Sequence, residues 1–166
     1  MKYLIFIFVS SIPFHLLGQS VNETVETINN LLKMYSNHSA KHIFPDFLYS
    51  QIEVDSNGLI ASYIYEKNPK ENKIVKIPNC HGYLKSLDGI IVSYQDTGIY
   101  KLNLVCPKGN KCLFNGHGNI IPSDPIGMGF AVTNLETQSK IENALMHLLV
   151  LAKNNAAFYS IQSQSN

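Results

Sequence analysis

The alternation of apolar and polar positions is most regular in Thr133–Asn154, and it predicts the helix around which the chain is organised. This segment opens with a Ser/Thr-x-x-Glu capping box, in which Thr133 and Glu136 each satisfy a free backbone N–H group of the first turn. Its apolar residues recur at helical spacing and form one face: Ile141, Leu145, Leu148 and Ala152. His147 belongs to the polar face, where we expect it to be solvated. A helix with this much apolar surface needs cover from other elements.

A second amphipathic helix is predicted from a capping box at Ser20-Val21-Asn22-Glu23 to about Ser36. Its apolar face is formed by Val25, Ile28, Leu32 and Tyr35. Because its other face is strongly polar, we expect this helix to pack on the outside of the domain.

Between the two helices the period changes to two, which predicts short antiparallel strands. The predicted strands are residues 51–54, 59–66, 73–77, 89–95, 99–106, 111–114 and 127–132. Asp55-Ser56-Asn57-Gly58 carries the Asn-Gly hairpin signal between the first two strands. In the fifth strand Lys101 and Asn103 share the face that we expect in solvent. The alternating Tyr63 and Tyr65 are more typical of packing than of a sugar-stacking platform.

Seven antiparallel strands closed by one C-terminal amphipathic helix resemble the pleckstrin-homology-like barrel. The resemblance covers about Gln51–Lys153 and implies an α+β fold, an antiparallel seven-strand bent barrel with a C-terminal capping helix and an additional N-terminal helix. Two local patterns, Cys106–Cys112 and Ile141–Leu148, also resemble small secreted bacterial proteins to which no activity is assigned. The resemblance implies no lipid binding, because the first hairpin loop, at residues 55–58, carries no cation.

The first residues resemble a secretory signal peptide: Lys2 precedes a short apolar run that ends at Gly18-Gln19-Ser20. A membrane anchor is the rival interpretation, but the run is short for a span and contains Pro13. We therefore expect a signal peptide at residues 1–19, one globular domain at 20–154 and a flexible tail at 155–166. The mature chain is then secreted or periplasmic and has no membrane span.

Composition narrows the range of partners. The chain has 13 cationic residues against 12 acidic ones, and every cationic residue is Lys. Arg is the residue best suited to bidentate recognition of phosphate and guanine, so its absence weighs against nucleic-acid binding. The lysines are also interspersed with acids, so the sequence shows no basic footprint for an acidic partner. No cofactor motif is present in the sequence.

The three cysteines suggest three kinds of chemistry. Cys106 and Cys112 bracket the turn between the fifth and sixth strands, and in an oxidising compartment they are expected to form a disulfide across that hairpin. The alternative is a zinc site that adds His117 and the pair Cys80-His81, although the spacing is not a standard one. Cys80 could also act as a nucleophile with a histidine, but adjacent residues of a strand point to opposite faces, so a core thiol is the simpler interpretation.

The sequence favours a non-catalytic interaction or binding module, since a well-specified fold lacks a recognisable catalytic constellation. Its expected contact surface is an exposed sheet edge, the Gly/Pro-rich loop at residues 115–126 or the N-terminal helix, and its expected partner is a protein or peptide. A thiol-dependent enzyme that uses Cys80, or a small metal-binding protein, is the alternative.

Overall fold

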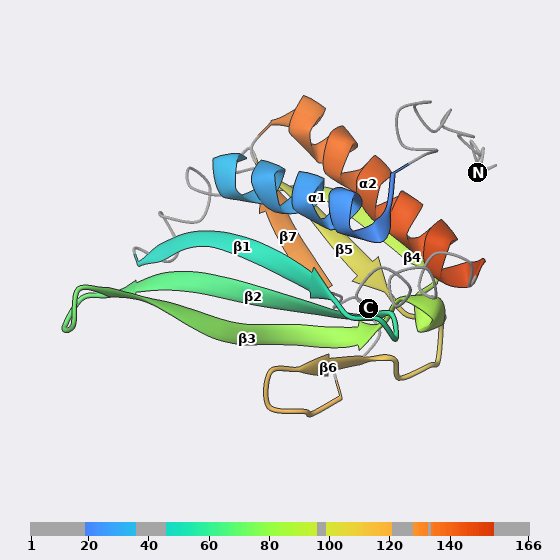
Figure 1. Cartoon of the computed structure of the whole chain (residues 1–166), viewed down its shortest axis with the longest axis horizontal. Coiled ribbons are helices and arrows are strands. Elements are labelled where there is room, and N and C mark those ends of the chain that lie inside the picture. The colour runs from blue at the N-terminus through green and yellow to red at the C-terminus, as the bar shows by residue number, and fades with distance from the viewer. Residues whose placement is uncertain (1–18, 36–45, 96–98, 121–127, 133, 155–166) are drawn as a thin grey trace, which may run out of the picture.

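Two antiparallel sheets and two helices form the fold, as a computed structural model that describes residues 19–35, 46–95, 99–120, 128–132 and 134–154 shows (Figure 1). The predicted α+β class and the antiparallel pairing are therefore confirmed. Residues 1–18 of the proposed signal peptide and the whole proposed tail lie outside the described residues, as do residues 121–126 of the loop at 115–126.

The first sheet has the strand order β1-β2-β3-β6. It consists of β1 (Phe47–Val54), β2 (Leu59–Asn68), β3 (Lys73–Tyr83) and the short β6 (Leu113–Asn115). The predicted turn at residues 55–58 joins β1 to β2, with the Gly58 N–H donating to the Asp55 carbonyl.

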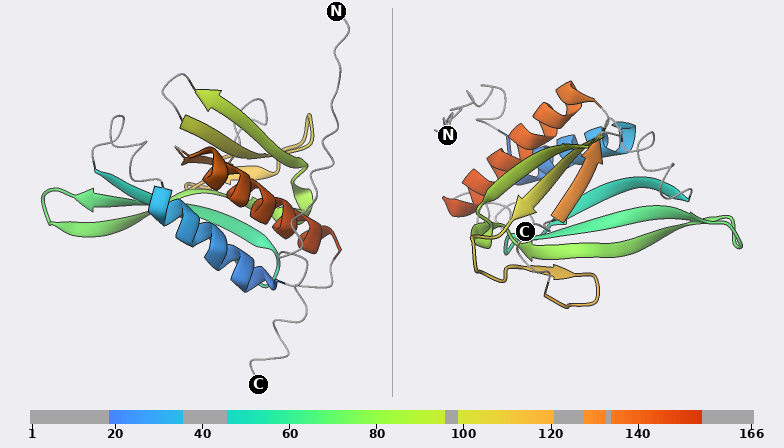
Figure 2. Two further views of the ribbon diagram at one scale, coloured as in Figure 1. Left: turned by 90° about the horizontal axis from the view of Figure 1, so that it is seen from above. Right: turned by 180° about the vertical axis from the view of Figure 1, so that it is seen from behind.

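The second sheet has the order β4-β5-β7 and consists of β4 (Gly89–Gln95), β5 (Ile99–Val105) and β7 (Met128–Val132). A short 3₁₀ helix, η3 (Leu84–Ser86), leads from the first sheet into the second. No backbone ladder joins the two sheets within the described ranges, and Figure 2 shows them diverging from one another. The strands thus form two sheets rather than the single bent barrel that the sequence suggested.

The strand boundaries differ from the prediction mainly in the first sheet. β1 begins at Phe47 instead of residue 51, and β3 continues through Pro78 to Tyr83 instead of ending at Ile77. A proline is tolerated there because the register between β2 and β3 shifts beside it, between Ser62 and Tyr63.

The helices α1 (Val21–Tyr35) and α2 (Leu135–Lys153) lie side by side (Figures 1 and 2). The first capping box is confirmed: the Ser20 N–H donates to Glu23 Oε2 at 2.7 Å, and the Glu23 N–H donates to Ser20 Oγ at 3.3 Å. The predicted capping box of α2 is wrong in its N-cap residue, because Asn134 and not Thr133 caps the helix. Its side-chain oxygen accepts from the Thr137 N–H at 3.0 Å.

The predicted core face of α2 is confirmed, and α1 contributes to the same core. Ile141, Leu145 and Leu148 are fully buried, but so are Ile28 and Leu32 of α1. One apolar cluster includes side chains from both helices and both sheets. The polar face of α1 lies in solvent, as expected, and its apolar face packs into the core against β1 and α2.

Two polar residues expected in solvent are also buried. His147 is 5% exposed, and its Nε2 lies 3.1 Å from the Gln19 carbonyl oxygen, so the segment that precedes α1 covers the polar side of α2. Asn103 is 7% exposed, and its side-chain oxygen has no hydrogen-bond partner among the described residues. In both cases packing partners remote in sequence bury a side chain that its local pattern places in solvent.

A side-chain clamp fixes α1 to the first sheet. Asn29 Nδ2 donates to the Ile52 carbonyl at 2.9 Å, and the Ile52 N–H donates to Asn29 Oδ1 at 2.8 Å. The amide thus supplies the two backbone bonds that a neighbouring strand would give to β1 at this position.

Replacement of Asn29 by Ala should lower the free energy of unfolding by about 1–3 kcal/mol, because the Ile52 N–H and C=O groups lose their partner. Asn30→Ala is the matched control: this neighbour is exposed, so its loss should change stability by less than about 0.5 kcal/mol. Urea unfolding followed by far-UV circular dichroism measures both. Equal effects of the two variants would show that α1 does not depend on this clamp.

Candidate binding surface

The first sheet has one face in the core and one face toward solvent. Ile52, Ile60 and Cys80 point inward and are buried in the common core, and α1 packs against β1 at that inner side. By the register, alternate residues of β1, β2 and β3 point outward, and no described helix lies over them (Figure 1). Lys33 of α1 reaches the margin of this side, where its Nζ lies 5.5 Å from the ring centroid of Tyr49. We call this outward side the outer face.

Three tyrosines from two strands line the outer face. The rings of Tyr49 and Tyr65, which pair across β1 and β2, stack with centroids 4.6 Å apart and planes 17° apart. Tyr63 lies under Lys76, whose Nζ is 3.7 Å from the ring centroid. All three tyrosines are half-buried, so part of each ring faces solvent. Tyr65 thus packs on Tyr49 and Tyr63 packs on Lys76, and both contacts lie on the solvent side of the sheet and not in the core.

One ion pair lies among these rings. Lys76 Nζ lies 2.5 Å from Glu53 Oε1, and both side chains are well exposed. The hydrogen bond to Glu53 raises the pKa of Lys76. Partial burial, followed by the negative charge of Glu53, raises the pKa of the Tyr63 phenol. The outer face is therefore an aromatic surface that carries a compensated pair of charges.

The outer face continues to the end of β3. His81 and Phe114, paired across β3 and β6, stack with ring centroids 5.5 Å apart. With Leu59 and Tyr83 they line a shallow, mainly apolar hollow of about 230 Å³. This arrangement brings together residues from three strands that are far apart in the sequence.

The edge of β3 beside this face lacks a strand partner over half its length. β6 pairs only with Cys80–Gly82, and the turn after it continues along this edge, where the Gly116 N–H donates to the Asn79 carbonyl at 2.9 Å. No described strand or turn pairs with the outer edge of residues 73–77. Ile74 is 62% exposed there, and Val75 and Ile77 are each 38% exposed. An apolar strand edge with free backbone groups is a template for a further strand.

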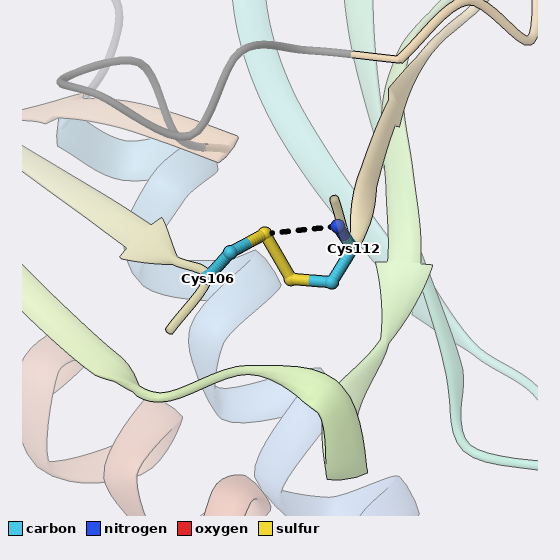
Figure 3. The surroundings of a disulfide bond; sticks show 2 residues. All are labelled: Cys106 and Cys112. Carbon is cyan, nitrogen blue, oxygen red and sulfur yellow. Dashed lines mark hydrogen bonds between the residues drawn. A yellow bond between two sulfur atoms is a disulfide. The ribbon is translucent and has the colours of Figure 1, made fainter. Parts of the chain in front are cut away.

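The disulfide joins the two sheets and does not cross a hairpin as expected. Cys106 directly follows β5, Cys112 directly precedes β6, and the sulfur atoms are 2.07 Å apart (Figure 3). The Cys112 N–H also donates to Cys106 Sγ at 3.2 Å. β5 and β6 belong to different sheets, so the bridge holds the crossover between them.

The alternative zinc site does not assemble. Two of its five predicted ligands are joined as the disulfide, and His117 is exposed in the turn after β6. His81 stacks on Phe114 on the outer face, whereas Cys80 is buried on the inner one. Within the described ranges, no group of three or more His, Cys, Asp or Glu residues is placed to hold a metal ion.

Cys80 is a core thiol. It is 4% exposed, and burial raises the pKa of its thiol to about 11. A nucleophilic cysteine needs a lowered pKa and a neighbouring base, and His81 points to the opposite face of the same strand. The geometry does not support the thiol-dependent enzyme.

The sequence drew attention to Tyr63 and Tyr65, which were interpreted as packing residues, and it did not draw attention to Tyr49. The predicted first strand began at Gln51, two residues after Tyr49, so the cross-strand partner of Tyr65 was left in a connector. An earlier strand start would have given Tyr49 the same parity as Gln51 and Glu53 and hence a place on the outer face.

No protein-family model, curated protein or solved structure matches this chain. Within the described part of the chain, no helix has the length and apolar character needed to cross a membrane. The surface described above is therefore interpreted from its own geometry.

Oxidised native protein should react slowly with iodoacetamide at pH 8, because a thiol with a pKa of about 11 is ionised in only about one molecule in a thousand. The modification rate should rise as the pH approaches 11. After unfolding without reductant, mass spectrometry should show one modified cysteine, Cys80, per chain. Three modified cysteines would refute the disulfide, and fast native labelling would refute the buried thiol.

Proposed function

We propose that this chain is a non-catalytic, secreted or periplasmic interaction module that binds an extended segment of a protein partner. The open edge of β3 at residues 73–77 is the docking edge, and the adjacent outer face is the contact surface for the partner's side chains. The observation that carries this proposal is the exposed apolar edge beside a row of half-buried tyrosines.

The physical argument rests on both parts of this surface. A peptide strand that adds to β3 would satisfy its free backbone groups, which supplies affinity without sequence preference. Its alternate side chains would then lie on the outer face, where Tyr63 and Tyr65 offer large rigid contact areas. Lys76 and Pro78 lie on the same stretch of β3, and such residues discourage indiscriminate strand pairing. Pairing would thus be selective.

Two further proposals accompany this function. Secretion is supported by the disulfide, which persists in oxidising compartments, and by the composition of the first residues. A relationship to the pleckstrin-homology-like architecture is supported by the antiparallel sheets and by the C-terminal helix packed against them. In this proposal α1 is an addition that has become part of the core.

Site-specific photo-crosslinking tests the docking edge. p-Benzoylphenylalanine placed at Ile74 should give discrete adducts when the full chain is illuminated with an envelope fraction of a producing cell. Ile91 is the matched control, since it is also an isoleucine on a strand at the margin of a sheet and is 55% exposed against 62% for Ile74. The same adducts from both positions, or none from Ile74, would contradict the proposal.

Removal of the aromatic contact area gives a second test. Tyr63→Ala combined with Tyr65→Ala should weaken capture of the crosslinked partner at least about tenfold, because interface tyrosines are frequent hot spots. Tyr94→Ala, which removes a 62% exposed tyrosine of the other sheet, should leave capture unchanged. Far-UV circular dichroism checks that each variant is folded. Equal capture by all variants would place the contact elsewhere.

A further inference from the structure

A second surface gathers positive charge, although the lysines are dispersed along the chain. A cleft of about 540 Å³ lies between η3, the segment bridged by the disulfide and the end of α2. Three lysines line it, one from each of these elements: Lys85, Lys111 and Lys153. It shares no lining residue with the hollow at the end of the outer face.

The charge of the cleft is not compensated by its own lining. Asp88 is the one acidic residue among the described residues that line it, so three positive charges meet one negative charge. In the described part of the chain, none of the three lysines forms an ion pair with a carboxylate. The nearest compensation for Lys85 is the ring of Tyr83, whose centroid lies 5.9 Å from its Nζ. Lys153 instead directs its Nζ toward the backbone oxygen of Asp88, at 3.5 Å. Like charges that face one cleft repel each other, and an anion between them relieves that repulsion.

The cleft is held by rigid parts of the fold. Lys111 adjoins Cys112, whose disulfide fixes the crossover between the sheets. Lys85 lies in η3 between two fully or nearly fully buried leucines, Leu84 and Leu87, and α2 packs directly on this helix. Lys153 is in the last turn of α2. The backbones that carry the three cations are therefore preorganised, and only their flexible ends must be ordered when a ligand binds.

We infer that this cleft binds a small polyanion that carries carboxylate or phosphate groups, independently of the partner proposed for the outer face. Its volume lies within the roughly 300–1,000 Å³ that is usual for small-molecule sites. Lysine presents a point charge with three donors and not the planar fork of arginine, so it accepts carboxylate and phosphate alike. Ser86 and Asn110 add neutral polar groups to the lining. A polyanion matches the excess of two positive charges.

Titration calorimetry of the oxidised chain at low ionic strength, with citrate and with inorganic pyrophosphate as probes, tests this site. At least one probe should bind with a stoichiometry of one, and its affinity should fall as salt is added. The stronger of the two identifies carboxylate or phosphate as the preferred group. Absence of binding by both probes would overturn the inference.

Lysine variants distinguish anion binding in this cleft from a general effect of the net charge of the protein. Lys85→Gln, Lys111→Gln and Lys153→Gln should each weaken binding about two- to fivefold, which is the usual range for one exposed charge pair, and the triple variant should abolish it. The control triple Lys67→Gln, Lys70→Gln and Lys73→Gln changes the net charge equally at the opposite end of the molecule (Figure 1). It should leave affinity within about twofold of the starting protein. Equal losses in the two triple variants, both folded by circular dichroism, would show non-specific attraction and overturn the site.

Discussion

Packing of α1 against α2 joins the two halves of this molecule, because no described backbone ladder connects the sheet β1-β2-β3-β6 with the sheet β4-β5-β7. α1 lies along β1, and α2 lies against η3 and the second sheet. The two sheets are therefore held together by burial of apolar side chains, whereas a closed barrel is held together by continuous strand pairing. These side chains include Ile28, Leu32, Leu145 and Leu148. The disulfide adds a covalent link at the crossover, where a loop this short contributes about 2 kcal/mol in the chain-entropy model.

This arrangement determines which surfaces remain for binding. α1 packs on the first sheet from its inner side, and no described helix lies on the outer side, so that side and the distal edge of β3 stay open. Natural sheets usually protect such edges, and here β6 protects only the last residues of β3. Gly82 makes that short pairing possible, since a Cβ atom there would lie 2.6 Å from the Cys112 carbonyl oxygen. The turn after β6 extends this close approach to Pro78 and Asn79 through Gly116, so the open edge is confined to residues 73–77.

The two proposed surfaces differ in the interaction they would use. The outer face and the edge of β3 offer aromatic area and backbone groups, which suit an extended polypeptide. The lysine cleft offers charge in a confined volume, which suits a small anion. Cys80 lies beneath the first surface as a packed, protonated thiol and takes part in neither.

The local elements could be predicted from the sequence, because each depends on neighbours within a few residues. These elements are the hairpin at residues 55–58, the cap at Ser20–Glu23, the buried face of α2 and the antiparallel strands. Which element packs against each apolar face depended on the tertiary structure. It buried His147, divided the strands between two sheets and brought Lys85, Lys111 and Lys153 to one cleft. These outcomes depend on contacts between segments far apart in sequence. A periodic pattern indicates that a face is apolar, but it does not indicate which element packs against that face.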